Sequence, residues 1–306
     1  MPAPLAWPVC PGEQVAPLWT GKGFQVGGEL RPFLLYHQDQ RAWDQGLTGL
    51  HEAEAGEDHF IDVASRLQAL ESLRRWLPTR DGVILEVGMS SGYFLSQMKA
   101  SFPQALVVGA DSFPEVLESF AKKDPSTPLL GFDLAACPLP DACVDAVVLL
   151  NVLEHIQDDA QAMGELARIL KPGGILVLEV PAGPRLYDNY DRHLRHFRRY
   201  TMGGFSSLVR AAGLEAVWRS HLGFFVFPGF AAVKLWNRLR HRQHAASGDQ
   251  AVADQIGHSR RQPFLAWLMA LERALGRHLY LPFGIRCLVV ARKTGRWQAS
   301  GETFKA

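Results

Sequence analysis

The chain has 306 residues, of which 47% are apolar and 21% charged, enough to bury a sizeable hydrophobic core. Its formal net charge of +1 argues against a protein drawn to nucleic acid or anionic membranes by overall charge. The four cysteines, Cys10, Cys137, Cys143 and Cys287, form no C-x-x-C pair and have no histidine cluster at zinc spacing. We therefore expect neither a disulfide framework nor a metal. With no secretory signal and no apolar stretch of roughly 18 residues, a cytoplasmic location is expected.

The N-terminal part of the chain differs in pattern from the rest. Residues 1–57 carry scattered Trp, Pro and Gly without a sustained period, which indicates an irregular arm or a small subdomain. From Phe60 to Trp76, apolar residues recur at helical spacing, and Pro78 closes the segment. An amphipathic helix is therefore expected to lead into the core.

Short apolar runs then alternate with helical segments. Strands are predicted at 83–87, 105–110, 146–150, 175–180, 214–220 and 285–292, and helices at 93–100, 114–122 and 160–170. Runs that are apolar without alternation suit strands covered on both faces. Their interleaving with helices predicts a doubly wound α/β domain with a parallel sheet.

This pattern divides the chain into four parts. They are an N-terminal arm at 1–57, a core at 58–222, a helical and aromatic insertion at 223–284, and a last core strand with a C-terminal tail at 285–306. Within the insertion, residues 241–261 are polar and rich in small residues, which predicts a mobile linker.

The loop after the first predicted strand reads Glu86-Val-Gly-Met-Ser-Ser-Gly92. Small residues there let the backbone approach a nucleotide-like ligand at the start of the next helix. The same letters also fit the G-x-S-x-G elbow of α/β-hydrolases, with Ser90 as nucleophile. Asp111, at the end of the next strand, favours the nucleotide interpretation, because a carboxylate there accepts hydrogen bonds from a ribose. Glu86 would repel a pyrophosphate but attract a cation such as a sulfonium that carries an amino group.

Five motifs stand in a fixed order along the chain. They are Val83-Ile-Leu-Glu-Val-Gly-Met-Ser-Ser-Gly-Tyr93, Asp111, Gly131-Phe-Asp133, Asp145-Ala-Val-Val-Leu-Leu-Asn-Val-Leu-Glu-His155 and Leu170-Lys-Pro-Gly-Gly174. This series resembles class I S-adenosylmethionine-dependent methyltransferases of the type 11, 12 and 23 groups, over about residues 60–220. The resemblance implies a mostly parallel seven-stranded, Rossmann-like sheet with one antiparallel strand near an edge, and S-adenosyl-L-methionine as cofactor. Ser90 stands where the family usually has the middle glycine of its loop.

The resemblance also implies a cofactor site of ten residues: Glu86, Gly88, Ser90, Gly92, Asp111, Ser112, Asp133, Leu134, Asn151 and Val152. Glu86 would lie beside the methionine part, Asp111 would hold the ribose, and Asp133 would meet the adenine amino group. Asn151 and Val152 would lie beneath the sulfonium and its methyl group. A strand-end cap at Asp111 and a turn residue at Asp133 are the structural alternatives.

Methyl transfer is an in-line displacement that needs a positioned acceptor, freed of its proton where necessary. His155 follows the fourth core strand at the edge where ligands bind in such sheets, so it is a candidate general base. The alternative is a helix-start residue that packs the cofactor pocket.

An arginine-rich segment, residues 192–201, follows the fifth core strand. It resembles the D-x-x-x-x-H-x-R-x-Y-T segment of a subset of the family. His196 and Tyr200 match there and are the other catalytic candidates. We interpret the segment as a lid that touches an acceptor, and its guanidinium groups favour an anionic one. The alternative is a basic loop that pairs with nearby acids.

The acceptor is expected to be a small molecule or a lipid-linked compound. Residues 222–236 are apolar and aromatic and precede several arginines, which favours a hydrophobic acceptor pocket or peripheral membrane contact, with burial in a helical cap as the alternative. Nucleic acid is disfavoured, because Asn151-Val-Leu-Glu replaces an N-P-P-Y-type tetrapeptide. Two other functions remain open: a non-catalytic binding protein with this fold, and a serine hydrolase that uses Ser90.

Overall fold

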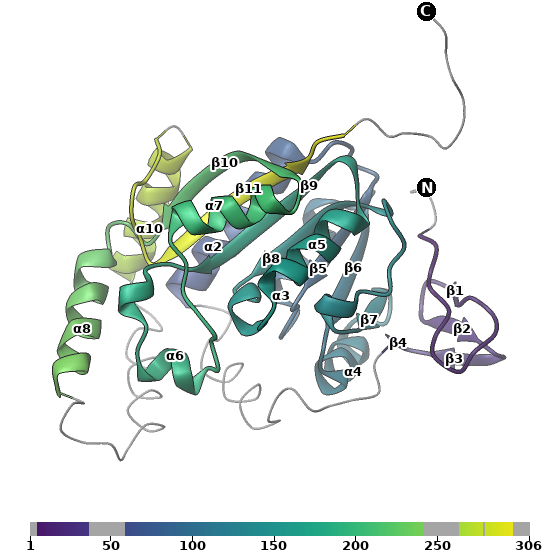
Figure 1. Cartoon of the computed structure of the whole chain (residues 1–306). Helices are drawn as coiled ribbons and strands as arrows, with labels where there is room; N and C mark the ends of the chain where they lie inside the picture. The colour runs from purple at the N-terminus through teal and green to yellow at the C-terminus, as the bar shows by residue number, and fades with distance from the viewer. Residues whose placement is uncertain (1–4, 37–58, 241–262, 278, 296–306) are drawn as a thin grey trace, which may run out of the picture.

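The computed structural model describes residues 5–36, 59–240, 263–277 and 279–295. Over these residues the chain forms one large sheet with helices on both faces and a small separate sheet near its N-terminus (Figure 1). The linker predicted at 241–261 and the second half of the predicted arm lie outside the described residues.

The central sheet has eight strands in the order β10-β11-β9-β8-β5-β6-β7-β4. Their bounds are β4 Leu34–Leu35, β5 Val83–Val87, β6 Leu106–Asp111, β7 Leu129–Gly131, β8 Val144–Leu150, β9 Leu170–Pro181, β10 Leu214–Leu222 and β11 Arg286–Lys293. Strand β11 runs antiparallel to both neighbours, and the other pairs are parallel. The predicted doubly wound, mostly parallel sheet is therefore confirmed, and the short strand β4 extends it at one edge.

Two helical layers cover the sheet. One consists of α2 (Phe60–Trp76), α3 (Tyr93–Ser101) and α4 (Pro114–Lys123), and the other of α5 (Asp159–Ile169) and α7 (Met202–Ala211). Successive side chains of a strand point to opposite faces, so Ile84 packs with the first layer and Leu85 with the second. Both are fully buried, which explains why the strands are apolar without alternation.

Further elements lie outside these two layers. Near the N-terminus, β1 (Leu18–Trp19), β2 (Phe24–Val26) and β3 (Glu29–Arg31) form an antiparallel sheet. In the predicted insertion, α8 (Phe227–Arg240) and α10 (Pro263–Gly276) are helical, and α10 packs on α2. Among the described residues, no helix has both the length and the apolar character needed to cross a membrane. The division into four parts stays a prediction.

Candidate active site

The loop between β5 and α3 depends on two glycines. Gly88 and Gly92 both have φ of +74°, a conformation that side chains rarely adopt. A Cβ atom at Gly88 would collide with Val152, and one at Gly92 would collide with Phe120. Gly88 therefore allows the loop to close over the segment that follows β8, and Gly92 allows it to pack against α4.

Asp111, at the end of β6, fixes the shape of this loop. Its Oδ2 accepts a hydrogen bond of 3.1 Å from the Ser90 backbone N–H, and its Oδ1 accepts one of 3.1 Å from the Phe113 N–H. Ser90 has φ of +47°, so the loop holds a non-glycine residue in a strained conformation. The ribose contact predicted for Asp111, with its exposed neighbour Ser112, stays a prediction.

Glu86 is the buried acid of the loop strand. It is only 4% exposed, and its Oε2 has no hydrogen-bond partner among the described residues. Burial raises the pKa of Glu86 well above its usual value, and the nearby Asp111 charge raises it further, while Arg66 acts in the opposite direction. A cationic ligand would stabilise this carboxylate, and the amino group of S-adenosylmethionine has the required charge.

The other predicted cofactor residues lie after β7 and β8. Asp133 caps the short 3-10 helix η1 (Leu134–Ala136) by accepting a 2.9 Å hydrogen bond from the Ala135 N–H, and Leu134 is buried beside it. Asn151 has φ of +55°. The capping role of Asp133 matches the structural alternative for that residue, and its adenine contact stays a prediction.

Beneath Asn151 lies a buried ionic network that sequence reasoning missed. Glu179 of β9 is fully buried, and its Oε1 accepts hydrogen bonds from Asn151 Nδ2 (3.0 Å), Ser65 Oγ (2.7 Å) and Arg286 Nη1 (2.7 Å). Arg286 also pairs with Asp62 of α2 at 2.6 Å. A signal was present, because Glu179 is the one charged residue in the apolar run 175–180.

The 3-10 helix η2 (Leu153–His155) follows β8 and carries the first catalytic candidate. Glu154 is fully buried, neither of its carboxylate oxygens has a hydrogen-bond partner among the described residues, and burial raises its pKa to about 8. The His155 ring packs edge-on against the His196 ring, with centroids 4.6 Å apart and planes at 82°. The structure therefore brings together two of the three catalytic candidates, from segments far apart in the sequence.

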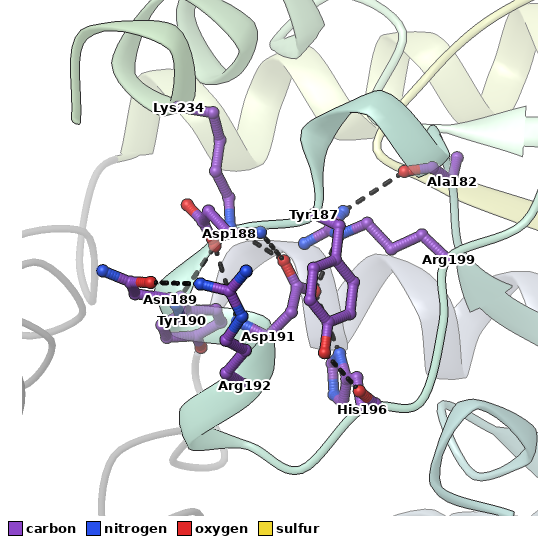
Figure 2. A network of polar contacts seen from close by, with 10 residues as sticks. All are labelled: Ala182, Tyr187, Asp188, Asn189, Tyr190, Asp191, Arg192, His196, Arg199 and Lys234. Atoms are coloured by element: carbon purple, nitrogen blue, oxygen red, sulfur yellow. Dashed lines mark hydrogen bonds and ion pairs between the residues drawn. The ribbon is translucent and has the colours of Figure 1, made fainter. Parts of the chain in front are cut away.

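The segment predicted to be a lid packs around Asp191, a fully buried residue of α6 (Asn189–His193). Figure 2 shows His196, Arg199 and Lys234 converging on its carboxylate. The distances are 3.0 Å from His196 Nδ1, 2.7 Å from Arg199 Nε and 3.5 Å from Lys234 Nζ. Burial by itself would raise the pKa of Asp191, but the His196 hydrogen bond and the two cations lower it below its usual value.

Two of the lid arginines pair with acids. Arg199 contacts Asp191, and Arg198 pairs with Asp159 at 2.7 Å. Tyr200 is buried, and its hydroxyl donates a 2.9 Å hydrogen bond to Asp159 Oδ2. Burial, together with Asp159, raises the pKa of Tyr200, so this hydroxyl keeps its proton at neutral pH. The catalytic role of Tyr200 stays a prediction.

Known proteins resemble this chain in its core. A family profile described as a methyltransferase domain matches residues 85–178. Over 153 residues the chain is 31% identical to trans-aconitate 2-methyltransferase of Azoarcus sp., covering 50% of this chain and 57% of that protein. Over 129 residues it is 34% identical to demethylmenaquinone methyltransferase of Thermus thermophilus, covering 40% of this chain and 57% of that protein.

A solved structure shares the fold. The chain superposes on phosphoethanolamine N-methyltransferase 2 of Haemonchus contortus, a complex with S-adenosyl-L-methionine, with a TM-score of 0.54. The match covers 84% of this chain and 59% of the other at 17% identity.

The matched segment spans 57% of the length of each of these two curated relatives. The profile match includes the whole glycine loop, β8 and η2, and with them the buried acids Glu86 and Glu154. Because this match is to a methyltransferase domain, it argues against the interpretation of Ser90 as the nucleophile of a hydrolase. Residues 85–178 therefore match a methyltransferase domain, and the described residues have the fold of class I S-adenosylmethionine-dependent methyltransferases.

Proposed function

We propose that this protein transfers a methyl group from S-adenosyl-L-methionine to a small-molecule or lipid-linked acceptor. The observation that carries the proposal is Glu86, a buried acid with an unpartnered Oε2 at the start of a tight glycine loop. An uncompensated buried carboxylate is costly, and a cationic ligand removes that cost. The two curated relatives are methyltransferases and support the same function.

The cofactor, when bound, supplies an electrophilic methyl group, and the protein is left with binding and positioning. Glu86 and Asp111 would hold its amino and ribose parts, and Asn151 and Val152 would lie beneath the sulfonium. Glu179 fixes the Asn151 side chain, so this part of the site is held from below. His155 and His196 would face the acceptor, where a proton must leave before or during transfer.

Two features support an acceptor with apolar surface. Helices α8 and α10 expose Leu235, Trp236, Phe264 and Trp267, each more than half exposed. Exposed apolar patches of this kind mark ligand or membrane contacts. The pairing of Arg198 and Arg199 with acids reduces the positive charge that an anionic acceptor would meet. Cytoplasmic location and an anionic acceptor remain predictions.

Calorimetric titration of the purified chain with S-adenosylmethionine and S-adenosylhomocysteine tests the proposal. We expect roughly micromolar binding to the wild type. Asp111→Ala removes two loop hydrogen bonds together with the predicted ribose contact, so it should weaken binding by roughly 100-fold or more. The matched control is Asp141→Ala, an exposed acid, which should bind as the wild type does.

If neither S-adenosylmethionine nor S-adenosylhomocysteine binds the folded wild type, the proposal is wrong and a non-catalytic role is favoured. The hydrolase alternative is tested separately with a fluorophosphonate probe. Labelling that is lost in Ser90→Ala would support it, whereas the methyltransferase function predicts no labelling.

A further inference from the structure

We propose that Glu154, His155 and His196 form a binding site for a zinc ion, with an open coordination position for an acceptor hydroxyl. One ligand atom from each of the three side chains lies within 4.8 Å of the others. Two imidazole nitrogens and one carboxylate oxygen are a donor set of catalytic zinc sites, in which three protein ligands leave a position free. This spacing allows one ion to contact all three after small side-chain adjustments.

The state of Glu154 is the second observation. Its side chain is fully buried, and neither carboxylate oxygen has a hydrogen-bond partner among the described residues. Buried acids in native proteins are nearly always hydrogen-bonded, paired or coordinated to a metal. A divalent cation between Glu154 and the two histidines would supply the missing partner.

The surroundings of His196 are the third observation. Its Nδ1 lies 3.0 Å from Oδ1 of the fully buried Asp191. Metal-binding histidines usually donate their second ring N–H to a carboxylate, which fixes the tautomer and the orientation of the ring. A proton on Nδ1 leaves the lone pair on Nε2, the nitrogen that would bind the ion. Arg199 and Lys234 contact the same carboxylate and fix its position.

The position of the cluster indicates what the ion would do, and this step rests on the proposed methyltransferase function. Val152, the residue before η2, packs so closely against Gly88 that a Cβ atom added there would collide with it. The cluster therefore adjoins the predicted cofactor loop. A zinc ion lowers the pKa of a bound hydroxyl, whose proton then passes to water. An amine acceptor would lose its reactive lone pair to the ion, so the site selects hydroxyl compounds. As ligands, His155 and His196 would no longer act as general bases.

The test is zinc binding to the full chain after removal of metal with a chelator. We expect one zinc ion per chain by calorimetry at roughly micromolar affinity or tighter, and visible absorption bands when Co²⁺ replaces it. Glu154→Gln and His196→Gln should each weaken binding roughly 100-fold and abolish the bands. Asp191→Asn, a change at a positioning residue, should weaken binding by about 10–100-fold. Glu118→Gln, an exposed acid on α4, is the matched control and should bind as the wild type does.

Circular dichroism and thermal unfolding of each variant show whether it is folded. Absence of stoichiometric zinc binding in the wild type would overturn the proposal, as would equal binding in wild type, Glu154→Gln and His196→Gln. Titration of the same samples with S-adenosylmethionine separates the two proposals. Cofactor binding without zinc binding would remove the metal site alone, whereas zinc binding without cofactor binding would leave the site and remove its role in methyl transfer.

Discussion

Arg286 of β11 and Glu179 of β9 form an ion pair of 2.7 Å between neighbouring antiparallel strands, with the Glu179 side chain fully buried. Asp62 holds the same guanidinium from α2 at 2.6 Å. The pair therefore ties one helical layer to the sheet directly beneath Asn151, so stability and the shape of the predicted methyl-transfer site depend on the same contacts.

Replacing Arg286 by Met should destabilise the fold by roughly 3–5 kcal/mol, because Glu179 would remain buried without its cation. Urea unfolding followed by circular dichroism measures the change in free energy of unfolding. Arg277→Met is the control, since Arg277 pairs with Glu71 from a half-exposed position, and a much smaller loss is expected there. Similar losses in the two variants would mean that the buried network adds nothing beyond a surface pair.

Replacing Gly88 by Ala should cost about 1–3 kcal/mol, because a side chain is strained at φ of +74° and its Cβ would strike Val152. Cofactor affinity should fall with it. Gly164→Ala is the matched control, because Gly164 lies within α5 with open space around it, and alanine there should stabilise by about 0.5–1 kcal/mol. Urea unfolding curves of both variants measure their free energies of unfolding. A Gly88→Ala protein as stable as Gly164→Ala would contradict the loop geometry.

Periodicity predicted the core elements closely. Helix α2 runs from Phe60 to Trp76 and β5 from Val83 to Val87, as expected. The start of β9 was less predictable: the strand was expected at 175–180 after a helix that ends at Leu170, but α5 ends at Ile169 and β9 begins at Leu170. Leu170 pairs with Val144 of β8, and such tertiary pairing is not visible in local sequence.

Some residues of the candidate site were likewise predictable from the sequence, and others were not. The glycine loop and Asp111 belong to short motifs, so they could be found by spacing alone. The contacts around His155 could not, because they require His196 to fold back from the lid. No metal was expected on the basis of sequence spacing, and the cluster with Glu154 appears only in the folded chain. The partners of Arg198 and Arg199 likewise depended on tertiary structure.

Binding of S-adenosylmethionine should release a proton from Glu86. Burial raises the pKa of this carboxyl, so it binds its proton more tightly in the folded than in the unfolded chain. Its contribution to stability therefore falls as pH rises from about 4.3, the usual glutamate value, through the raised folded-state pKa. A cationic ligand favours the carboxylate, so cofactor affinity should rise with pH over the same window.

Calorimetry in two buffers of different ionisation enthalpy counts the released protons. Glu86→Gln should release fewer protons and bind the cofactor roughly 10–100-fold more weakly, while its stability should fall less with rising pH. Equal proton release by wild type and variant would show that Glu86 does not meet the cation. Glu118→Gln again serves as the control, and it should keep the proton release and the cofactor affinity of the wild type.

Replacing Lys234 by Met should loosen the lid without unfolding the core. Lys234 Nζ donates a 2.6 Å hydrogen bond to Asp188 Oδ1, which connects α8 to the start of α6 (Figure 2). Met keeps the apolar stem and removes the charge, while Arg199 and His196 still hold Asp191. Loss of a charged hydrogen bond worth about 1.5–3 kcal/mol should raise local opening by roughly 10–100-fold.

Hydrogen exchange measured by mass spectrometry detects this opening as faster exchange in peptides that cover residues 188–196. Peptides of β5 and β8 should exchange at the wild-type rate, because Lys234 contributes nothing to the sheet. Lys122→Met, which removes an exposed ion pair with Glu118 on α4, is the matched control and should leave the lid peptides unchanged. Faster exchange across the whole sheet in Lys234→Met would contradict a local lid and would make Lys234 part of the global fold, because exchange through global unfolding affects every protected peptide.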